Sequence, residues 1–215
     1  MTDTRATLID QAMRLSPVIP VLVVDDVAHA APLAQALFEG GIKVLEITLR
    51  TPQALAVIEA MARAVPQAVI AAGTVTNPAQ LAAAQRAGAQ FAVSPGLTPA
   101  LAEAVQQPGA LPLLPGVATA SELMLGLDAG LERFKLFPAE AVGGIKLLQS
   151  LHGPFPQAVF CPTGGITLDS APKYLALPNV ACVGGSWLAP KAVMAAGQWD
   201  QIRALAQQAA ALPRD

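Results

Sequence analysis

The sequence predicts an α/β fold, a (β/α)8 TIM barrel with an extra N-terminal helix. Strand-like and helix-like segments alternate along all 215 residues, each strand-like run is continuously apolar, and no charged or Ser/Pro-rich linker divides the chain. Continuous apolar runs are typical of parallel strands that helices cover on both faces. We therefore expect one domain over residues 1–215, with the extra helix over about 1–16 and the barrel over 17–215.

The elements follow one another in the order that such a barrel requires. An amphipathic helix is expected over about residues 3–15, and eight strands should follow it. Eight β–α units of about 25 residues each fit a small (β/α)8 barrel. The eight predicted strands span residues 17–24, 42–48, 68–73, 91–96, 111–116, 133–138, 158–165 and 180–186.

Several helix starts are explicit between these strands. The pairs Thr51-Pro52, Asn77-Pro78 and Thr98-Pro99 each offer an N-cap followed by proline at the first helical position. Thr119 and Glu122 have the spacing of a capping box. A doubly wound open sheet is the alternative architecture, but the count of eight strands disfavours it. No Gly-x-Gly-x-x-Gly turn follows the first strand either.

The composition excludes several classes of protein. Hydrophobic residues make up 53% of the chain and charged residues 13%, which is too apolar for a disordered chain. Pro and Gly interrupt the apolar runs before they reach the length of a membrane span. A net charge of −2 and 4% aromatic residues provide no basic stripe or stacking platform for nucleic acid. Since the N-terminus lacks the features of a secretory signal, we expect a cytoplasmic protein without nucleic-acid or membrane partners.

Lys135 is the outlier among the five lysines. It lies within an apolar strand, whereas the other four fall in loops or on helices. One interpretation is a neutral amine that attacks a carbonyl to form a Schiff base. The other is an ion pair with a carboxylate deep in the barrel, and Lys135 alone does not decide between the two.

A second polar set lies on the strand over 42–48. Glu46, Thr48 and Arg50 alternate with leucine and isoleucine, so they share one face of a buried strand. Glu46 could be the ion-pair partner of Lys135 or a general acid/base beside it. Arg50 lies at the strand end, where a guanidinium can grip a carboxylate or phosphate. A carboxylate, an arginine and a lysine that converge from two strands favour a functional site.

Glycine pairs at the ends of the last two strands are a further candidate for a binding site. Gly-Gly pairs at 164–165 and 184–185 follow the last two strands, where many barrels bind phosphate on backbone N–H groups. Two glycine-dependent turns are the alternative. We expect no catalytic role for five other residues: the two histidines should be solvated, and the two cysteines and the tryptophan should pack in the core. No cluster has the spacing of metal ligands. These five are His29, His152, Cys161, Cys182 and Trp187.

Seven stretches of the sequence resemble one family. VLEITLR, AAGTV, FAVSPG, LPLLPG, FKLFPAE, FCPTGGI and GGSWL are similar to segments of the 2-keto-3-deoxy-6-phosphogluconate (KDPG) aldolases, also described as 4-hydroxy-2-oxoglutarate aldolases. The resemblance runs in order from about Pro17 to the C-terminal region. It implies a (β/α)8 barrel, a homotrimer and a class I aldolase that needs no metal or other cofactor.

The resemblance also implies a role for each matched residue. Lys135 corresponds to the Schiff-base lysine and Glu46 to the general acid/base. Two residues are implied to hold the pyruvyl carboxylate, two to line the pocket, and five to receive the hydroxyls and phosphate of the substrate. These are, in that order, Arg50 and Thr74; Pro95 and Phe137; and Thr163, Gly164, Gly165, Gly185 and Ser186.

The implied function is reversible cleavage of 2-dehydro-3-deoxy-6-phosphogluconate to pyruvate and glyceraldehyde 3-phosphate. The substrates are thus a phosphorylated keto sugar acid and pyruvate, and 4-hydroxy-2-oxoglutarate is a possible second substrate. One alternative is a 2-dehydro-3-deoxy-6-phosphogalactonate aldolase, although Thr163 resembles the gluconate branch more. Others are a phosphate-binding barrel isomerase or epimerase, a sugar-acid sensor and a metal-dependent aldolase.

Overall fold

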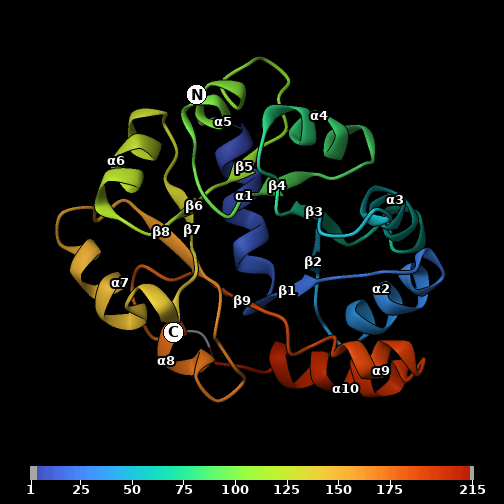
Figure 1. Cartoon of the computed structure of the whole chain (residues 1–215). Coiled ribbons are helices and arrows are strands. Elements are labelled where there is room, and N and C mark those ends of the chain that lie inside the picture. Colours follow the sequence, from blue (N-terminus) through green and yellow to red (C-terminus); the bar gives the residue numbers. More distant parts are fainter. Residues whose placement is uncertain (1–3, 214–215) are drawn as a thin grey trace.

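The computed structural model describes residues 4–213 of the chain, with parallel strands at the centre and helices around them (Figure 1). The strands of the described part are β1 (Val18–Leu22), β2 (Val44–Thr48), β3 (Val69–Gly73), β4 (Phe91–Val93), β5 (Leu113–Leu114), β6 (Gly116–Val117), β7 (Arg133–Leu136), β8 (Val159–Pro162) and β9 (Val183–Gly185). The α-helices are α1 (Thr4–Leu15), α2 (Ala30–Glu39), α3 (Ala54–Ala64), α4 (Pro78–Arg86), α5 (Pro99–Ala104), α6 (Ala120–Asp128), α7 (Gly144–His152), α8 (Ala171–Leu175), α9 (Lys191–Ala195) and α10 (Trp199–Ala210), with short 3-10 helices η1 (Val27–His29) and η2 (Glu140–Val142). None of these described helices has the length and apolar character needed to cross a lipid bilayer.

The strands pair in parallel and form two sheets. One sheet has six strands in the order β5-β4-β3-β2-β1-β9, and the other has three in the order β6-β7-β8. Isolated parallel bridges join Phe160 to Val180 and Thr163 to Gly184, where β8 and its flanks run beside β9. The predicted α/β class with a parallel, curled sheet is therefore confirmed (Figure 1).

The prediction of a single strand over 111–116 is wrong. Two short strands, β5 and β6, lie on either side of Pro115. Proline has no N–H to donate to a sheet ladder, so it interrupts the run. β5 pairs with β4 and β6 pairs with β7, so the chain passes from one sheet to the other at Pro115. The other seven predicted runs each contain one strand.

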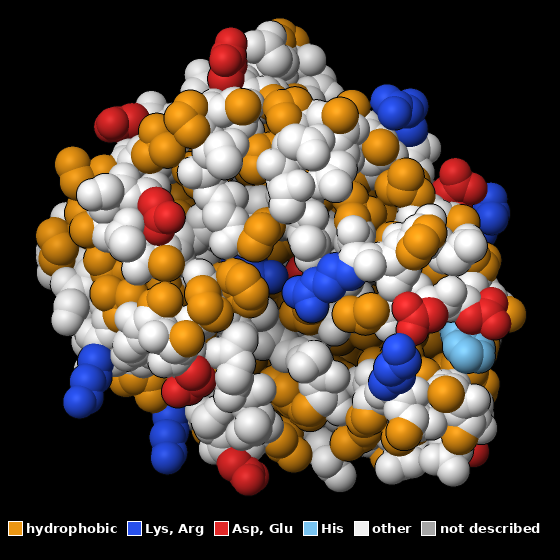
Figure 2. Space-filling model, viewed as in Figure 1, with side chains coloured by type: hydrophobic (Ala, Val, Ile, Leu, Met, Phe, Trp, Pro, Cys, Tyr) orange, Lys and Arg blue, Asp and Glu red, His pale blue; other side chains and the backbone are white. Residues whose placement is uncertain are grey.

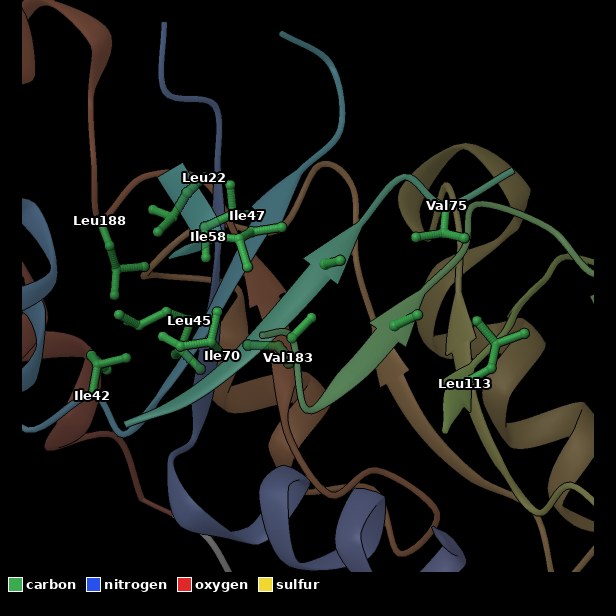
Figure 3. Close-up of a cluster of buried hydrophobic side chains, with 14 of the residues drawn as sticks. Leu22, Ile42, Leu45, Ile47, Ile58, Ile70, Val75, Leu113, Val183 and Leu188 are labelled. Atoms are coloured by element: carbon green, nitrogen blue, oxygen red, sulfur yellow. The ribbon is translucent and has the colours of Figure 1, made fainter. Parts of the chain in front are cut away.

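The strands are buried on both faces, as their continuous apolar runs predict. Leu45 and Ile47 of β2 belong to an outer cluster that also contains Ile58 of α3, and Figure 3 shows part of this cluster. Residues on the opposite, concave face form a second cluster that includes Val44 and Phe91. The alternation along β2 therefore places Glu46 and Thr48, like Val44, on the concave face.

The predicted extra N-terminal helix is present as α1. Ile9, Ala12 and Met13 of α1 are buried in the concave-face cluster, and Figure 1 shows α1 behind the strands. Because α1 covers the N-terminal ends of the strands, the concave face is approached from their C-terminal ends. Active sites of parallel α/β barrels lie at those ends.

Helix capping follows the sequence except at one start. Asn77, Thr98 and Thr119 cap α4, α5 and α6, and Thr119 and Glu122 form the predicted capping box. The prediction of an N-cap at Thr51 is wrong, because α3 begins at Ala54. The Thr51 hydroxyl instead donates to the carbonyl of Val24 at 2.9 Å, which ties two connections together at the C-terminal ends of β1 and β2.

An ion-pair network fixes α1 to β7. Asp10 accepts hydrogen bonds from Nε of Arg133 at 2.7 Å and from Nε of Arg14 at 2.9 Å. Burial by itself raises the pKa of Asp10, but the two guanidinium groups outweigh burial and hold the pKa below its ordinary value. A carboxyl pKa lowered by folding contributes stability above the unfolded-state pKa. That contribution is lost as the pH falls through the folded-state pKa.

We predict that Asp10→Asn lowers the free energy of unfolding by about 1 kcal/mol at pH 7, because the charge-assisted hydrogen bonds are weakened. The deficit should shrink as the pH falls below about 4, where Asp10 of the unfolded wild type takes up a proton, and it should continue to shrink down through the lowered folded-state pKa. Urea unfolding at pH 7 and pH 3 measures both values. Asp200→Asn is the matched control, since the Asp200 side chain is 93% exposed and should matter little. An equal deficit at both pH values would contradict this account.

Candidate active site

Lys135 and Glu46 meet on the concave face of the sheets. Lys135 comes from β7 and Glu46 from β2, and the Nζ–Oε1 distance is 3.2 Å. The residues are only 4% and 3% exposed. Figure 2 shows blue and red side-chain atoms together in a hollow near the middle of the molecular face that it presents.

A buried pair of this kind is a weak source of stability. Desolvation of the two charges offsets much of their attraction, and an apolar pair of similar volume is often at least as stable. Removing one partner leaves the other as an uncompensated charge, which costs about 3–5 kcal/mol. The pair between Lys135 and Glu46 therefore favours a functional interpretation over a purely structural one.

Small neighbouring residues make room for these two long side chains. Lys135 is in register with Gly116 of β6 on one side and Cys161 of β8 on the other. A Cβ atom at Gly73 of β3 would overlap the carboxylate of Glu46. The sequence shows Gly73 only as an ordinary strand-end residue, so its role as space for the Glu46 carboxylate was missed.

The Arg50–Thr74 pair lies at the C-terminal ends of β2 and β3. Nε of Arg50 donates to Oγ1 of Thr74 at 3.2 Å. Thr74 has a φ of 59°, and it is the only described non-glycine residue with positive φ. Such a backbone costs about 1–3 kcal/mol for a non-glycine residue and persists where the surroundings enforce it. Thr48, by contrast, donates to the carbonyl of Leu22 at 2.8 Å and is buried, which gives it a structural role.

Phe137 lies beside the amine of Lys135, and Pro95 lies beside Gly116, the register partner of Lys135. Nζ of Lys135 is 5.4 Å from the ring centroid of Phe137, within the range of a cation–π contact. A Cβ at Gly116 would overlap the backbone carbonyl of Pro95, and Gly116 is the register partner of Lys135. Both residues are half-buried.

The other predicted residues gather at the C-terminal ends of β8 and β9. Thr163 bridges to Gly184, and a Cβ at Gly184 would overlap the Thr163 hydroxyl. Gly164 and Gly165 have φ values of 105° and 83°, a left-handed conformation that favours glycine. Ser186 is exposed and directly follows Gly185, the last residue of β9.

The structure thus places the predicted residues along one edge, in three groups. These are the Lys135–Glu46 pair with its lining, the Arg50–Thr74 pair, and the loops after β8 and β9. Among the described residues, no hydrogen bond or ion pair joins Arg50 or Thr74 to Lys135. Nor does the described part of the chain contain a group of three or more His, Cys, Asp or Glu side chains placed to hold a metal ion.

The sequence analysis missed one further pair at this edge. Tyr174 of α8 donates to Oε1 of Glu140 at 2.5 Å, and Glu140 directly follows the chain segment that leaves β7. The available signal was modest. Tyr174 is the only tyrosine in the chain, and three apolar residues follow it directly.

The arrangement has a definite chemical capacity. A buried amine can attack a carbonyl carbon, and a carboxylate within hydrogen-bond reach can move the protons that imine formation requires. An amine and a carboxylate at the C-terminal ends of parallel strands are the equipment of an aldolase that works through a lysine. The fold and the site therefore define a lyase of this class.

The comparison with known families makes the assignment specific. The sequence profile of the KDPG and KHG aldolase family matches residues 9–205. The chain therefore belongs to the KDPG and KHG aldolase family. The 2-dehydro-3-deoxy-phosphogluconate aldolase of Dickeya dadantii is 54% identical over 205 residues, which cover 95% of this chain and 96% of that protein.

Two solved structures are similar over nearly their whole length. The 2-keto-3-deoxy-6-phosphogluconate aldolase of Zymomonas mobilis, crystallised with 3-phosphoglycerate, matches with a TM-score of 0.89 and 54% identity over 96% of each chain. The KDPG aldolase of Legionella pneumophila, with pyruvate captured as a covalent carbinolamine, matches with a TM-score of 0.91 and 48% identity. That match covers 94% of this chain and 98% of the Legionella chain.

We predict that Gly73→Ala abolishes most of the activity, because the new methyl group overlaps the Glu46 carboxylate and drives it away from Lys135. A displacement of about 1 Å can cost on the order of a hundredfold in rate. Steady-state cleavage assays measure the loss. Gly153→Ala is the matched control, since a Cβ at Gly153 meets no atom within 4 Å. Wild-type activity in Gly73→Ala would show that the two side chains do not need this space.

Proposed function

We propose that this chain is a class I aldolase that reversibly cleaves 2-dehydro-3-deoxy-6-phosphogluconate to pyruvate and glyceraldehyde 3-phosphate. The observation that carries the proposal is the buried contact between Lys135 and Glu46. Family membership and the covalent pyruvate adduct of the Legionella relative support the same chemistry.

Lys135 and Glu46 divide the bond-making and the proton transfers between them. Glu46 takes a proton from the Lys135 ammonium, the neutral Nζ adds to the C2 carbonyl of the substrate, and Glu46 returns the proton to the departing hydroxyl so that the carbinolamine loses water. The iminium that results accepts the electron pair of the C3–C4 bond while Glu46 removes the proton from the C4 hydroxyl. Glyceraldehyde 3-phosphate leaves, C3 of the enamine takes up a proton, and water hydrolyses the pyruvyl imine.

The surrounding residues bind and orient the substrate in this proposal. Arg50 and Thr74 hold the pyruvyl carboxylate, which directs the carbonyl carbon toward the amine. Pro95 and Phe137 wall the pocket. The hydroxyls and the phosphate bind along the loops after β8 and β9, where left-handed glycines expose backbone N–H groups. The residues assigned to these loops are Thr163, Gly164, Gly165, Gly185 and Ser186.

The proposal includes a closed (β/α)8 barrel as a single domain. The bridges between β8 and β9 and the continuity of β5 with β6 through Pro115 support closure of the two sheets into one ring of eight strands. A homotrimer in the cytoplasm is part of the same proposal, and it rests on the family resemblance.

The same site also supports a second substrate, and the known relatives disfavour the alternative functions. 4-Hydroxy-2-oxoglutarate has the keto acid that Lys135, Glu46 and Arg50 are proposed to engage, and the family is described by both substrates. We therefore propose it as a second substrate, cleaved to pyruvate and glyoxylate. A phosphogalactonate aldolase and a phosphate-binding isomerase or epimerase are less favoured, because relatives that are 54–57% identical are named for phosphogluconate.

Borohydride reduction in the presence of pyruvate tests the proposal directly. We expect one pyruvyl adduct per chain, which peptide mapping places on Lys135. Lys146→Met is the control, since Lys146 is exposed on α7 and its loss should leave the adduct intact. Pyruvate binding without a reducible adduct would remove the class I mechanism. An adduct without cleavage of the phosphogluconate substrate would support Schiff-base formation on Lys135 and would exclude phosphogluconate as the substrate.

We predict that Glu46→Gln lowers kcat for cleavage by about 10²- to 10⁴-fold, because the amide cannot exchange protons with the carbinolamine or the C4 hydroxyl. The variant should also unfold at a lower temperature, since the Lys135 ammonium loses its buried counter-charge. Stopped-flow measurement of imine formation separates the two effects. Wild-type kcat in Glu46→Gln would assign the proton transfers to another group.

A further inference from the structure

The hydrogen bond between Tyr174 and Glu140 joins α8 to the 3-10 helix η2, and the proposed mechanism uses neither side chain. The phenolic hydroxyl donates to Oε1 of Glu140 over 2.5 Å. Tyr174 is only 2% exposed, whereas Glu140 is exposed and opens the turn after β7. A Cβ at Gly144 would lie 2.5 Å from the phenolic oxygen, so glycine there makes room for the hydroxyl. A buried phenol thus holds an exposed carboxylate at the C-terminal edge.

Glu140 packs directly against the glycine loop after β8. A Cβ at Gly165 would lie 2.6 Å from Cγ and 2.7 Å from Cβ of Glu140. The backbone N–H groups of Ala139 and Glu140 donate to the carbonyls of Thr163 and Gly164 at 2.8 and 3.1 Å. The segment that follows β7 and the glycine loop are therefore bound to each other, and Glu140 is the charged side chain at their junction.

The electrostatics of this junction depend on where the carboxylate lies. Burial raises the pKa of Tyr174, and the hydrogen bond to Glu140 raises it further, so the phenol remains a donor at neutral pH. A glutamate without this partner regains its rotamer freedom. Its carboxylate can then swing toward the backbone N–H groups of Gly164 and Gly165 and repel an anion there.

We propose that Tyr174 is a positioning residue that pins the Glu140 carboxylate, so that the Gly164–Gly165 loop stays open to the phosphate of the substrate. This inference rests on the proposed function, because it takes the glycine loop as the phosphate site. Tyr174 touches no reacting atom and acts through Glu140. Its effect is therefore on phosphate affinity and not on the chemistry at Lys135.

Tyr174→Phe is the first test, since it keeps the ring and removes only the hydroxyl. We expect the KM for the phosphorylated substrate to rise about tenfold, as for loss of a hydrogen bond to a charged group. The kcat and the KM for 4-hydroxy-2-oxoglutarate, which has no phosphate, should stay unchanged. Adding Glu140→Gln to Tyr174→Phe should restore the KM, because the loose side chain then carries no charge.

A second test leaves Tyr174 in place and changes only the exposed partner. Glu140→Asp shortens the side chain so that the carboxylate no longer reaches the phenol, and Glu140→Asn has the same length without the charge. We expect the KM for the phosphorylated substrate to rise about tenfold in Glu140→Asp and to stay near wild type in Glu140→Asn. Both variants leave the phenol equally unpaired, so their difference isolates the charge.

Several outcomes would overturn the inference. They are an unchanged KM in both Tyr174→Phe and Glu140→Asp, an equal rise for the two substrates, or equal effects of Glu140→Asp and Glu140→Asn. A thermal-unfolding comparison with Asp10→Asn, at the opposite end of the strands, separates lost stability from lost phosphate affinity. Failure of the proposed function would appear in the wild-type protein itself, as absence of phosphogluconate cleavage.

Discussion

The contact between Lys135 and Glu46 is the constraint on which the rest of this structure depends. An ammonium and a carboxylate that are 4% and 3% exposed must lie together, because neither is tolerated alone in an apolar interior. The strands curl so that β7 and β2 present these side chains to each other. Gly73 leaves the space that the Glu46 carboxylate fills, and Gly116, the register partner of Lys135, allows the backbone of Pro95 to approach closely. The fold encloses a polar pair although two apolar side chains of the same volume would often be at least as stable.

The N-terminal and C-terminal ends of the strands differ in packing and in backbone geometry. At the N-terminal end, α1 buries apolar side chains in the concave-face cluster and is fixed by the ion pair of Asp10 with Arg133. At the C-terminal end the backbone departs from regular geometry, with Thr74 and the Gly164–Gly165 loop in left-handed conformations. Thr74, the one described non-glycine residue with positive φ, thus lies at the end where the substrate is proposed to bind, and the opposite end supplies stability.

Much of the site was predictable because its signals are local. Lys135 within an apolar strand, and the alternation of Glu46 with leucine and isoleucine, identify both members of the pair from strand periodicity alone. The interpretation as an ion pair and the interpretation as a catalytic amine are also compatible, since the carboxylate that stabilises the ammonium is placed to move protons. The pairing of Tyr174 with Glu140 was not predictable. The two residues are 34 positions apart, and only the packing of α8 against the loop after β7 brings them together.

The sequence by itself determined the order of strands and helices, most helix caps, the extra N-terminal helix and the identity of the two central residues. These depend on periodicity, on capping chemistry and on the anomaly of a charge in an apolar run, all of which are read within a few residues. Only the tertiary structure decided that Pro115 divides a strand between two sheets, that Thr51 bonds to Val24 instead of capping a helix, and that Glu140 is held by Tyr174. Each of these depends on which backbone or side chain arrives from a distant part of the chain, and that is set by the packing of the whole fold.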